Sequence, residues 1–165
     1  MRSMIELNGK WELLYSEDRP EINSIIPTFM NAYVTEAVPG YWEDMIPSLQ
    51  MAPYWNLVKF NPEYRPLRYP MSGTVPDMVL ETIVGCFWYR RNVHIDADCG
   101  NKSVIFHCGG VQNRALLWVN GRFAGEHCGY STPFFFDISE LLHYGEDNEI
   151  IMAVSNHEAH NESGE

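Results

Sequence analysis

The sequence is short of positive charge, of long apolar runs and of closely spaced cysteines. It contains 11 Lys and Arg against 22 Asp and Glu, which gives a formal net charge of −11. Because nucleic acids and anionic membranes attract basic patches, this balance argues against both as partners. No segment has the apolar length that a signal peptide or a membrane span needs, so we expect a cytoplasmic protein with no membrane contact.

The cysteines and histidines form no pattern typical of a metal or disulfide site. The four cysteines include no CxxC pair, and without an export signal we expect reduced thiols, with Cys86 and Cys108 in strands. No His or Cys pair has zinc-finger spacing, and Asp96 to Asp98 is only the nearest approach to a calcium loop, so we expect no metal. Phosphate loops and nucleophile elbows are also missing, and nothing predicts a cofactor.

The most informative stretch runs from Gly109 to Glu140. Apolar and aromatic residues alternate from Ala115 to Asn120, which predicts a strand with both faces covered. Asn120-Gly121 then predicts a hairpin turn, because a type I′ turn needs positive φ at two residues and these two tolerate it. The sequence from Arg122 to His127 is the expected returning strand.

Two further signals follow in the same stretch. Phe134 to Phe136 is a short, wholly apolar run, typical of a strand covered on both faces. Asp137 or Ser139 is expected to cap a helical turn that begins at Glu140.

The remaining strands are predicted from short apolar and aromatic runs between turn signals. Together with the stretch above they indicate one all-β sandwich, and 165 residues with 45% hydrophobic content can bury a substantial core. A turn is expected at 145–148, and the expected strands are Lys10–Tyr15, Tyr33–Val38, Thr82–Ile95 with a kink near Gly85, Lys102–His107 and Glu149–Val154.

Two segments do not fit this pattern. Residues 43–81 are rich in proline and aromatics, so we expect a long, packed insertion with little regular structure. Residues 156–165 are polar and are expected to fray, which leaves 1–155 as the domain.

A family resemblance rests on three motifs in order. The stretch LLWVNGRFAGEHCGYSTPFFFDIS (116–139) resembles the N-terminal sugar-binding domain of glycoside hydrolase family 2, the β-galactosidase, β-glucuronidase and β-mannosidase group, whose pattern runs V-W-V-N-G, G-x-H-x-G-G-Y, P-F, D-I-T. Val38 to Trp42 resembles the family's V-P-x-x-W, and Trp88 to Arg91 its W-Y-R-R. The chain departs from the pattern in Cys128 at a variable position, a single Gly129 before Tyr130, and Ser139 in place of Thr.

The resemblance implies a jelly roll of the galactose-binding-like type that packs on a catalytic (β/α)₈ barrel in cis and lends loops to the sugar-pocket rim. Retaining catalysis needs two carboxylates about 5–5.5 Å apart, and in this family they come from the barrel, which takes roughly 250 residues by itself. We therefore assign no catalytic residue and treat Asn148-Glu149 and Asn161-Glu162 as chance matches to the acid/base motif. The parent protein is expected to be a glycoside hydrolase that acts on a β-glycoside.

The family's domain continues with another strand, so the resemblance also implies a missing closing strand and a truncated chain.

The candidate sugar-binding residues follow the Val38-Pro39 break. Tyr41, Trp42 and Glu43 combine aromatic rings, which stack on sugar C–H surfaces, with a carboxylate that accepts hydroxyl protons. The resemblance implies that this loop lies at the pocket lip. The alternatives are that Trp42 is a core residue and Glu43 a solvated turn residue.

The other candidates are interpreted as structural. Adjacent Arg90 and Arg91 point to opposite faces of a strand; one is expected to pair with a buried acid such as Asp137 and the other to be solvated. His127 and Tyr130 flank a glycine-rich bend, which they either fix or present to a ligand. Asn120 and Gly121 form the hairpin turn.

Two other functions stay open at this point. A self-sufficient carbohydrate-binding module would expose a planar row of Trp or Tyr. A structural domain would self-associate through an unpaired sheet edge, which is a template for pairing and would give a homo-oligomer.

Overall fold

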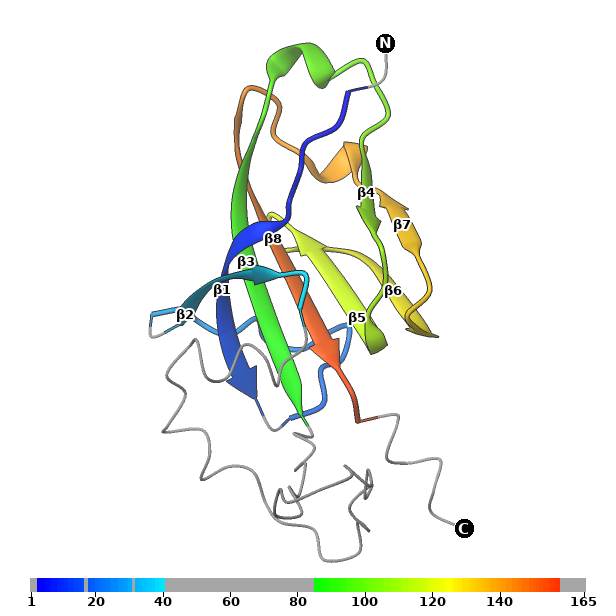
Figure 1. Ribbon diagram of the computed structural model, residues 1–165. Helices are drawn as coiled ribbons and strands as arrows, with labels where there is room; N and C mark the ends of the chain where they lie inside the picture. The colour runs from blue at the N-terminus through cyan, green and yellow to red at the C-terminus, as the bar shows by residue number, and fades with distance from the viewer. Residues whose placement is uncertain (1–2, 17, 31, 41–84, 158–165) are drawn as a thin grey trace, which may run out of the picture.

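The described part of the chain contains eight antiparallel strands (Figure 1). The computed structural model describes residues 3–16, 18–30, 32–40 and 85–157. Within them there is no α-helix, so the all-β prediction is confirmed. The elements are β1 (Gly9–Ser16), β2 (Tyr33–Val38), β3 (Cys86–Ile95), β4 (Ile105–Cys108), β5 (Gln112–Val119), β6 (Arg122–Tyr130), β7 (Phe134–Asp137) and β8 (Glu146–Ser155), with 3-10 turns η1 (Ala97–Cys99) and η2 (Ser139–Leu141).

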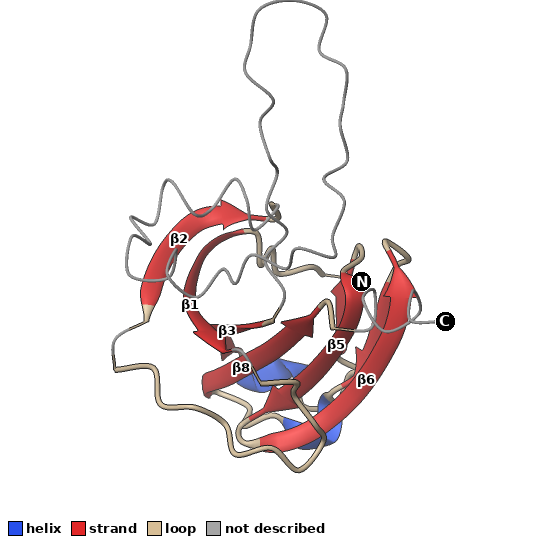
Figure 2. Cartoon of the chain, turned by 90° about the horizontal axis from the view of Figure 1, so that it is seen from below, coloured by secondary structure: helices blue, strands red, loops and turns tan. Residues whose placement is uncertain are grey.

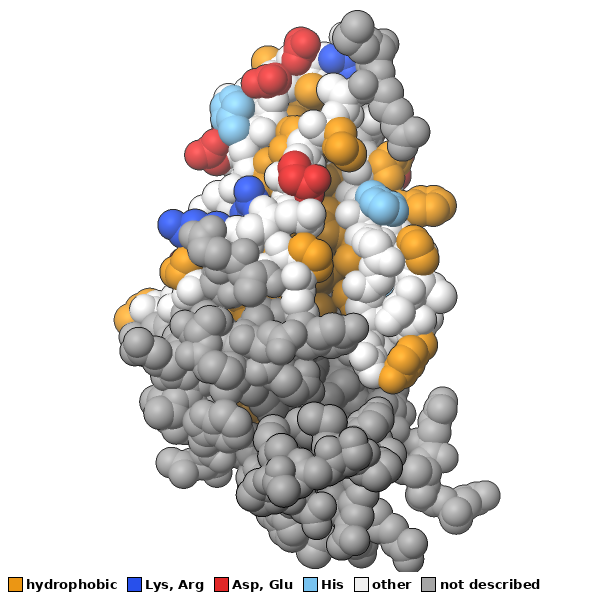
Figure 3. All heavy atoms as spheres, in the orientation of Figure 1, with side chains coloured by type: hydrophobic (Ala, Val, Ile, Leu, Met, Phe, Trp, Pro, Cys, Tyr) orange, Lys and Arg blue, Asp and Glu red, His pale blue; other side chains and the backbone are white. Residues whose placement is uncertain are grey.

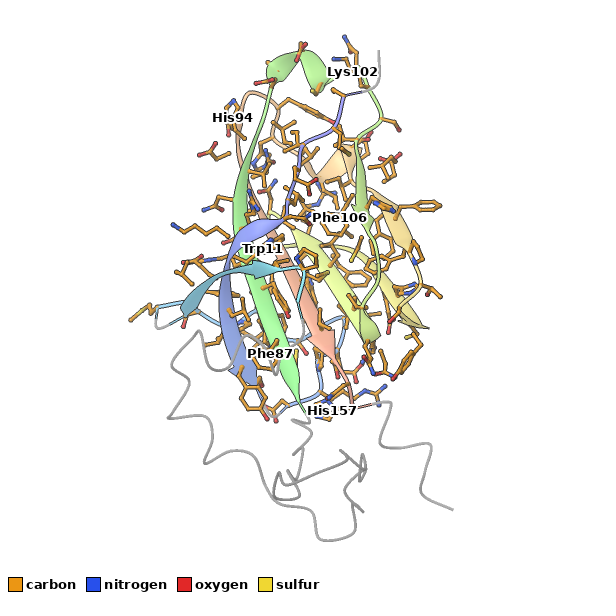
Figure 4. All side chains as sticks on the ribbon, viewed as in Figure 1. Trp11, Phe87, His94, Lys102, Phe106 and His157 are labelled. Atoms are coloured by element: carbon orange, nitrogen blue, oxygen red, sulfur yellow. The ribbon has the colours of Figure 1, made fainter. Side chains whose placement is uncertain are left out.

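The strands form a large and a small sheet. The six-stranded sheet has the order β2-β1-β3-β8-β5-β6, and β4 and β7 form a two-stranded sheet. Figure 2 shows that the large sheet curves strongly from β2 round to β6. The small sheet packs against its inner face through Phe106 and Phe134, which belong to the same buried cluster as Trp11 and Phe87 (Figure 4).

The three central strands bury both faces. On the inner face, Phe87, Leu117 and Met152 belong to the main core. The outer face carries a second cluster, in which the rings of Trp88 and Trp118 stack with centroids 5.5 Å apart. Every residue from Ala115 to Val119 is buried, which confirms the strand predicted with both faces covered.

An irregular segment covers the outer cluster. We call residues 20–30, between β1 and β2, the strap; Figure 2 shows it running outside the curve of the large sheet. Its side chain Phe29 belongs to the same buried cluster as the tryptophan pair, and Ile26 packs against that cluster. The strap has no periodic pattern of apolar residues, so strand periodicity does not predict this covering segment.

A buried arginine fixes the strap to the sheet. Arg114 of β5 is 5% exposed and donates to the carbonyl oxygen of Pro20 over 2.7 Å. The guanidinium also bonds Glu126 at 2.5 Å and Glu21 at 3.3 Å. Two carboxylates and a carbonyl therefore compensate the desolvated charge, as a buried cation requires.

Some strand predictions need correction. β8 begins at Glu146, so Glu146 to Asn148 belong to a strand and not to a turn. β7 is covered on one face only: Phe134 is buried, but Phe135, which pairs with His107, is 70% exposed. Figure 3 shows apolar side chains at the surface over the small sheet. β4 begins at Ile105, later than predicted.

The predicted insertion at 43–81 lies outside the described residues, as does most of the predicted tail. Asn156, the first residue of that tail, is buried, and its Oδ1 accepts a hydrogen bond from the amide of Gly85 over 3.0 Å. None of the helical turns among the described residues is long and apolar enough to cross a membrane.

The central packing yields a stability prediction. Leu117→Ala removes a fully buried side chain from the inner face, and we expect it to lower the free energy of unfolding by about 2–5 kcal/mol. Urea unfolding followed by tryptophan fluorescence measures the change, with the exposed Ile25→Ala as control. A loss below about 1 kcal/mol would mean that the site is not packed as described.

Candidate functional site

The predicted sugar-binding residues Tyr41, Trp42 and Glu43 lie outside the described residues, but the strand that leads to them is defined. β2 runs antiparallel to β1, and Val38 lies opposite Gly9 at the start of β1. The chain therefore reaches Tyr41 three residues beyond this corner of the large sheet.

This corner is held by two side chains from the sheet. The indole Nε1 of Trp11 donates to the carbonyl of Leu7 over 2.7 Å. Arg91 donates from Nη1 to the carbonyls of Leu7 and Asn8, over 2.7 and 3.0 Å, and lies 5.9 Å from the Trp11 ring. Arg91 is thus bound to the backbone, and the prediction that one of the two arginines is solvated is wrong.

Arg90 points to the opposite face, as predicted, but with other partners. Its Nε lies 2.6 Å from Glu12 Oε2, and its Nη1 lies 3.8 Å from Glu149 Oε2. The guanidinium also sits 4.6 Å from the centroid of the Phe29 ring, a cation–π contact with the strap. The suggested pair with Asp137 is therefore wrong, because Glu12 lies directly opposite Arg90 in the β1–β3 ladder.

Asp137 instead organises the turn after β7. Its Oδ1 accepts bonds from the Ser139 amide at 3.0 Å and the Ser139 hydroxyl at 2.5 Å, and its Oδ2 accepts from Ser103 at 3.0 Å. These bonds, the Ser139 hydroxyl first, lower the pKa of the Asp137 carboxyl. Ser139 in turn accepts from the amide of Val104 over 2.8 Å.

The Asn120-Gly121 turn adopts the predicted geometry. Both residues have positive φ, 51° and 73°, and Val119 pairs with Arg122 across them. The Asn120 side chain donates to the Leu141 carbonyl at 2.8 Å and accepts from the Glu149 amide at 3.0 Å. The turn therefore joins the β5–β6 hairpin to η2 and to β8.

Asn148 completes this junction. The sequence analysis does not predict this role, because it expects Asn148 in a turn. Its side chain is fully buried, and its Oδ1 accepts from Asn120 at 2.7 Å and from the His143 amide at 2.7 Å. Its Nδ2 donates to the carbonyls of His143 at 2.9 Å and Glu146 at 3.0 Å. The position of this asparagine directly before an apolar strand is the sequence feature that could have indicated a buried structural role.

Asn148-Glu149, one of the two dipeptides that match the acid/base motif, is used structurally here: Asn148 is enclosed and Glu149 faces Arg90. Asn161-Glu162 lies outside the described residues.

His127 and Tyr130 make contacts within the β5–β6–β7 region. The His127 ring stacks on Phe134 with centroids 4.4 Å apart, and its Nε2 lies 3.1 Å from Thr132 Oγ1. The Tyr130 hydroxyl bonds the Gln112 side chain. A Cβ at Gly129 would lie 2.6 Å from Thr132 Oγ1, which explains the glycine between them.

Within the described residues, no group of three His, Cys, Asp or Glu side chains is placed to hold a metal ion. Asp96, nearest to the calcium pattern, lies 3.8 Å from His94 Nε2, while Asp98 lies 3.5 Å from Lys102 Nζ (Figure 4). The four cysteines form no disulfide, and Cys86 and Cys108 lie in β3 and β4 as predicted.

The family follows from a match along almost the whole chain. The model described as "Glycosyl hydrolases family 2, sugar binding domain" matches residues 4–162. The chain belongs to glycosyl hydrolase family 2. The resemblance drawn from the three sequence motifs is therefore confirmed, and the chain is a sugar-binding domain of this family.

Two β-galactosidases are similar to the chain over different lengths. The β-galactosidase of Thermoanaerobacter pseudethanolicus is 43% identical over 72 residues, which are 43% of this chain and 10% of that protein. The β-galactosidase of Pectobacterium atrosepticum is 30% identical over 154 residues, 90% of this chain and 13% of that protein. The chain thus spans only a small part of the length of these two β-galactosidases.

Solved structures of two β-glucuronidases share the fold. The β-D-glucuronidase of Dictyoglomus thermophilum aligns with a TM-score of 0.60 at 20% identity, over 91% of this chain and 19% of that one. The Bifidobacterium dentium β-glucuronidase, solved with coumarin-3-O-glucuronide, aligns with a TM-score of 0.60 at 21% identity, over 91% of this chain and 20% of that one.

The asparagine junction yields a second prediction. Asn148→Ala removes four hydrogen bonds from a buried site, and we expect a loss of about 1–3 kcal/mol in the free energy of unfolding. Chemical denaturation compares it with Asn101→Ala, a change at an exposed turn residue. Equal effects of the two changes would contradict the role of the junction.

The Asp137 carboxyl yields a third. Because its folded pKa lies below its unfolded value of about 3.9, its contribution to stability is present at neutral pH and is lost as the pH falls through the folded pKa. We expect wild type to be more stable than Asp137→Asn at pH 7, and the difference to shrink below about pH 4. Unfolding curves at several pH values measure it; a difference that does not change with pH would refute it.

Proposed function

We propose that the chain acts as the non-catalytic N-terminal sugar-binding domain of a retaining β-glycosidase of the β-galactosidase or β-glucuronidase type. The observation that carries this proposal is the family match over residues 4–162, together with β-galactosidase relatives aligned over 90% of the chain. In this proposal the acid/base and the nucleophile come from a (β/α)₈ barrel, a fold of roughly 250 residues that the chain is too short to contain.

The finer fold assigned in the proposal is a jelly roll of the galactose-binding-like type. Two antiparallel sheets packed face to face, with a curved larger sheet, support it.

The proposed pocket-rim residues are Tyr41, Trp42 and Glu43. Their support is the bonding of the corner from which they extend: β2 is paired with β1, and Arg91 and Trp11 donate to the carbonyl of Leu7. A loop that reaches into a neighbouring domain's pocket needs a fixed base, because loosely held groups bind poorly.

The described carboxylates favour a supporting role for this domain over a catalytic one. Glu12 and Glu149 share Arg90, Glu21 and Glu126 share Arg114, and Asp137 accepts from serines. Each of these acids is thus engaged in holding elements together.

The proposed location is the cytoplasm.

A domain exchange tests the proposal. We expect the isolated chain to show no hydrolysis of o-nitrophenyl β-D-galactoside, and a chimera in which it replaces the matching part of the Pectobacterium atrosepticum β-galactosidase to hydrolyse it. In the chimera, Glu43→Gln should raise KM about tenfold through loss of a charged hydrogen bond, whereas exposed Glu140→Gln should not.

Turnover by the isolated chain that disappears in Glu43→Gln would overturn the proposal, since it would place a catalytic group inside this domain. An unchanged KM for Glu43→Gln in an active chimera would remove Glu43 from the rim.

A further inference from the structure

The sequence contains two Asn-Gly dipeptides, and the structure places them in different environments. One is Asn120-Gly121 at the tip of the β5–β6 hairpin, and the other is Asn8-Gly9, where the chain enters β1. Asparagine before glycine is a chemically reactive pair, because a glycine without a Cβ lets its amide nitrogen reach the side-chain amide of the asparagine. The surroundings of each pair therefore decide whether it reacts.

The side chain of Asn120 is held by three hydrogen bonds. Its Nδ2 donates to the Leu141 carbonyl at 2.8 Å and to Asn148 Oδ1 at 2.7 Å, and its Oδ1 accepts from the Glu149 amide at 3.0 Å. The strands β5 and β6 pair directly on both sides of the turn. Ring closure onto Gly121 would require the loss of these bonds, so the fold protects this pair.

The side chain of Asn8 has no such anchor. Asn8 is exposed, and in the part of the chain that the structure describes no hydrogen bond involves its side chain. Its backbone amide donates to Glu6 Oε1 at 3.2 Å, and its carbonyl accepts from Arg91 at 3.0 Å. β1 begins at Gly9, and its pairing with β2 is irregular between Gly9 and Trp11. A Cβ at Gly9 would meet no atom within 4 Å, so the space beside this glycine is open.

Arg91 makes the Asn8-Gly9 peptide bond more reactive. Its Nη1 donates to the Asn8 carbonyl oxygen, which belongs to the same peptide unit as the Gly9 nitrogen. When that nitrogen loses its proton, negative charge moves to the carbonyl oxygen through the resonance of the peptide bond. A guanidinium at this oxygen stabilises the charge, as donors do in an oxyanion hole. The contact therefore favours the deprotonated nitrogen, which is the form that attacks.

We propose that the fold makes Asn8 a site of spontaneous deamidation while it protects Asn120. The Gly9 nitrogen gives its proton to water and attacks Cγ of Asn8. The new N–Cγ bond closes a succinimide ring, the Cγ–Nδ2 bond breaks, and ammonia leaves with a proton from the solvent. Water then opens the ring at either carbonyl, which leaves aspartate or isoaspartate at position 8. The reaction consumes water, releases ammonia and needs no enzyme.

The products change the corner where β1 and β2 meet. Both add a negative charge, and isoaspartate also routes the backbone through the side-chain carbon, so that the carbonyl bound by Arg91 becomes part of a free carboxylate. Because Gly9 lies opposite Val38, isoaspartate at position 8 alters the end of the β1–β2 ladder. The modification belongs to the folded chain by itself and does not rest on the proposed function.

Incubation of the folded 165-residue chain in mildly alkaline buffer, followed by digestion and peptide mass spectrometry, tests the site. The peptides with Asn8 and Asn120 contain the same reactive dipeptide, so they are compared within one sample. We expect Asn8 to convert at least about tenfold faster, because only Asn120 must first break its side-chain hydrogen bonds. An isoaspartate-specific methyltransferase should label the Asn8 peptide.

The same incubation in urea is the control for the role of the fold, because both dipeptides should then convert at similar rates. Asn8→Gln should remove the fast reaction, since glutamine must close a larger ring, and it should leave folding unchanged because the side chain is exposed. The proposal is overturned if the folded chain converts Asn8 no faster than Asn120. A tenfold difference that persists in urea would also overturn it, because the fold would then not be the cause.

Discussion

Burial of both faces of β3, β5 and β8 is the constraint on which the rest of the domain depends. A sheet that is apolar on both sides needs two covers, and here the small sheet supplies one and the strap the other. Such strands pose a problem of register. A slip by one residue exchanges two faces that are nearly equivalent in hydrophobicity, so apolar patterning alone specifies the pairing weakly.

Polar groups at the two ends of β5 resolve this ambiguity. At one end Asn120 binds Asn148 and the backbone of Glu149, and at the other Arg114 binds the strap while lying opposite Ser155. A shifted register would leave these buried groups without partners, which costs more than a shifted apolar contact. A small number of buried polar residues therefore sets the register of the many apolar residues in these strands.

The sequence alone indicated the parts of the fold that local chemistry controls. Asn120-Gly121 announced the hairpin because only certain residues tolerate positive φ, and ordered motifs identified the family. Partners across strands could not be predicted in the same way: Arg90 meets Glu12 only once β1 and β3 are in register. The strap and Arg114 escaped prediction because an irregular segment has no period, and Phe135 was misplaced because three phenylalanines in a row resemble a doubly covered strand.

The position of β8 in the sheet also bears on how the chain is made. β3 pairs with β1 on one side and with β8 on the other. Along the chain, residues 96–145 separate β3 from β8. During synthesis the hairpin β5–β6 can close across its two-residue turn, but the apolar β3 must wait for β8. The strand at the centre of the finished sheet is thus, until β8 emerges, an open edge.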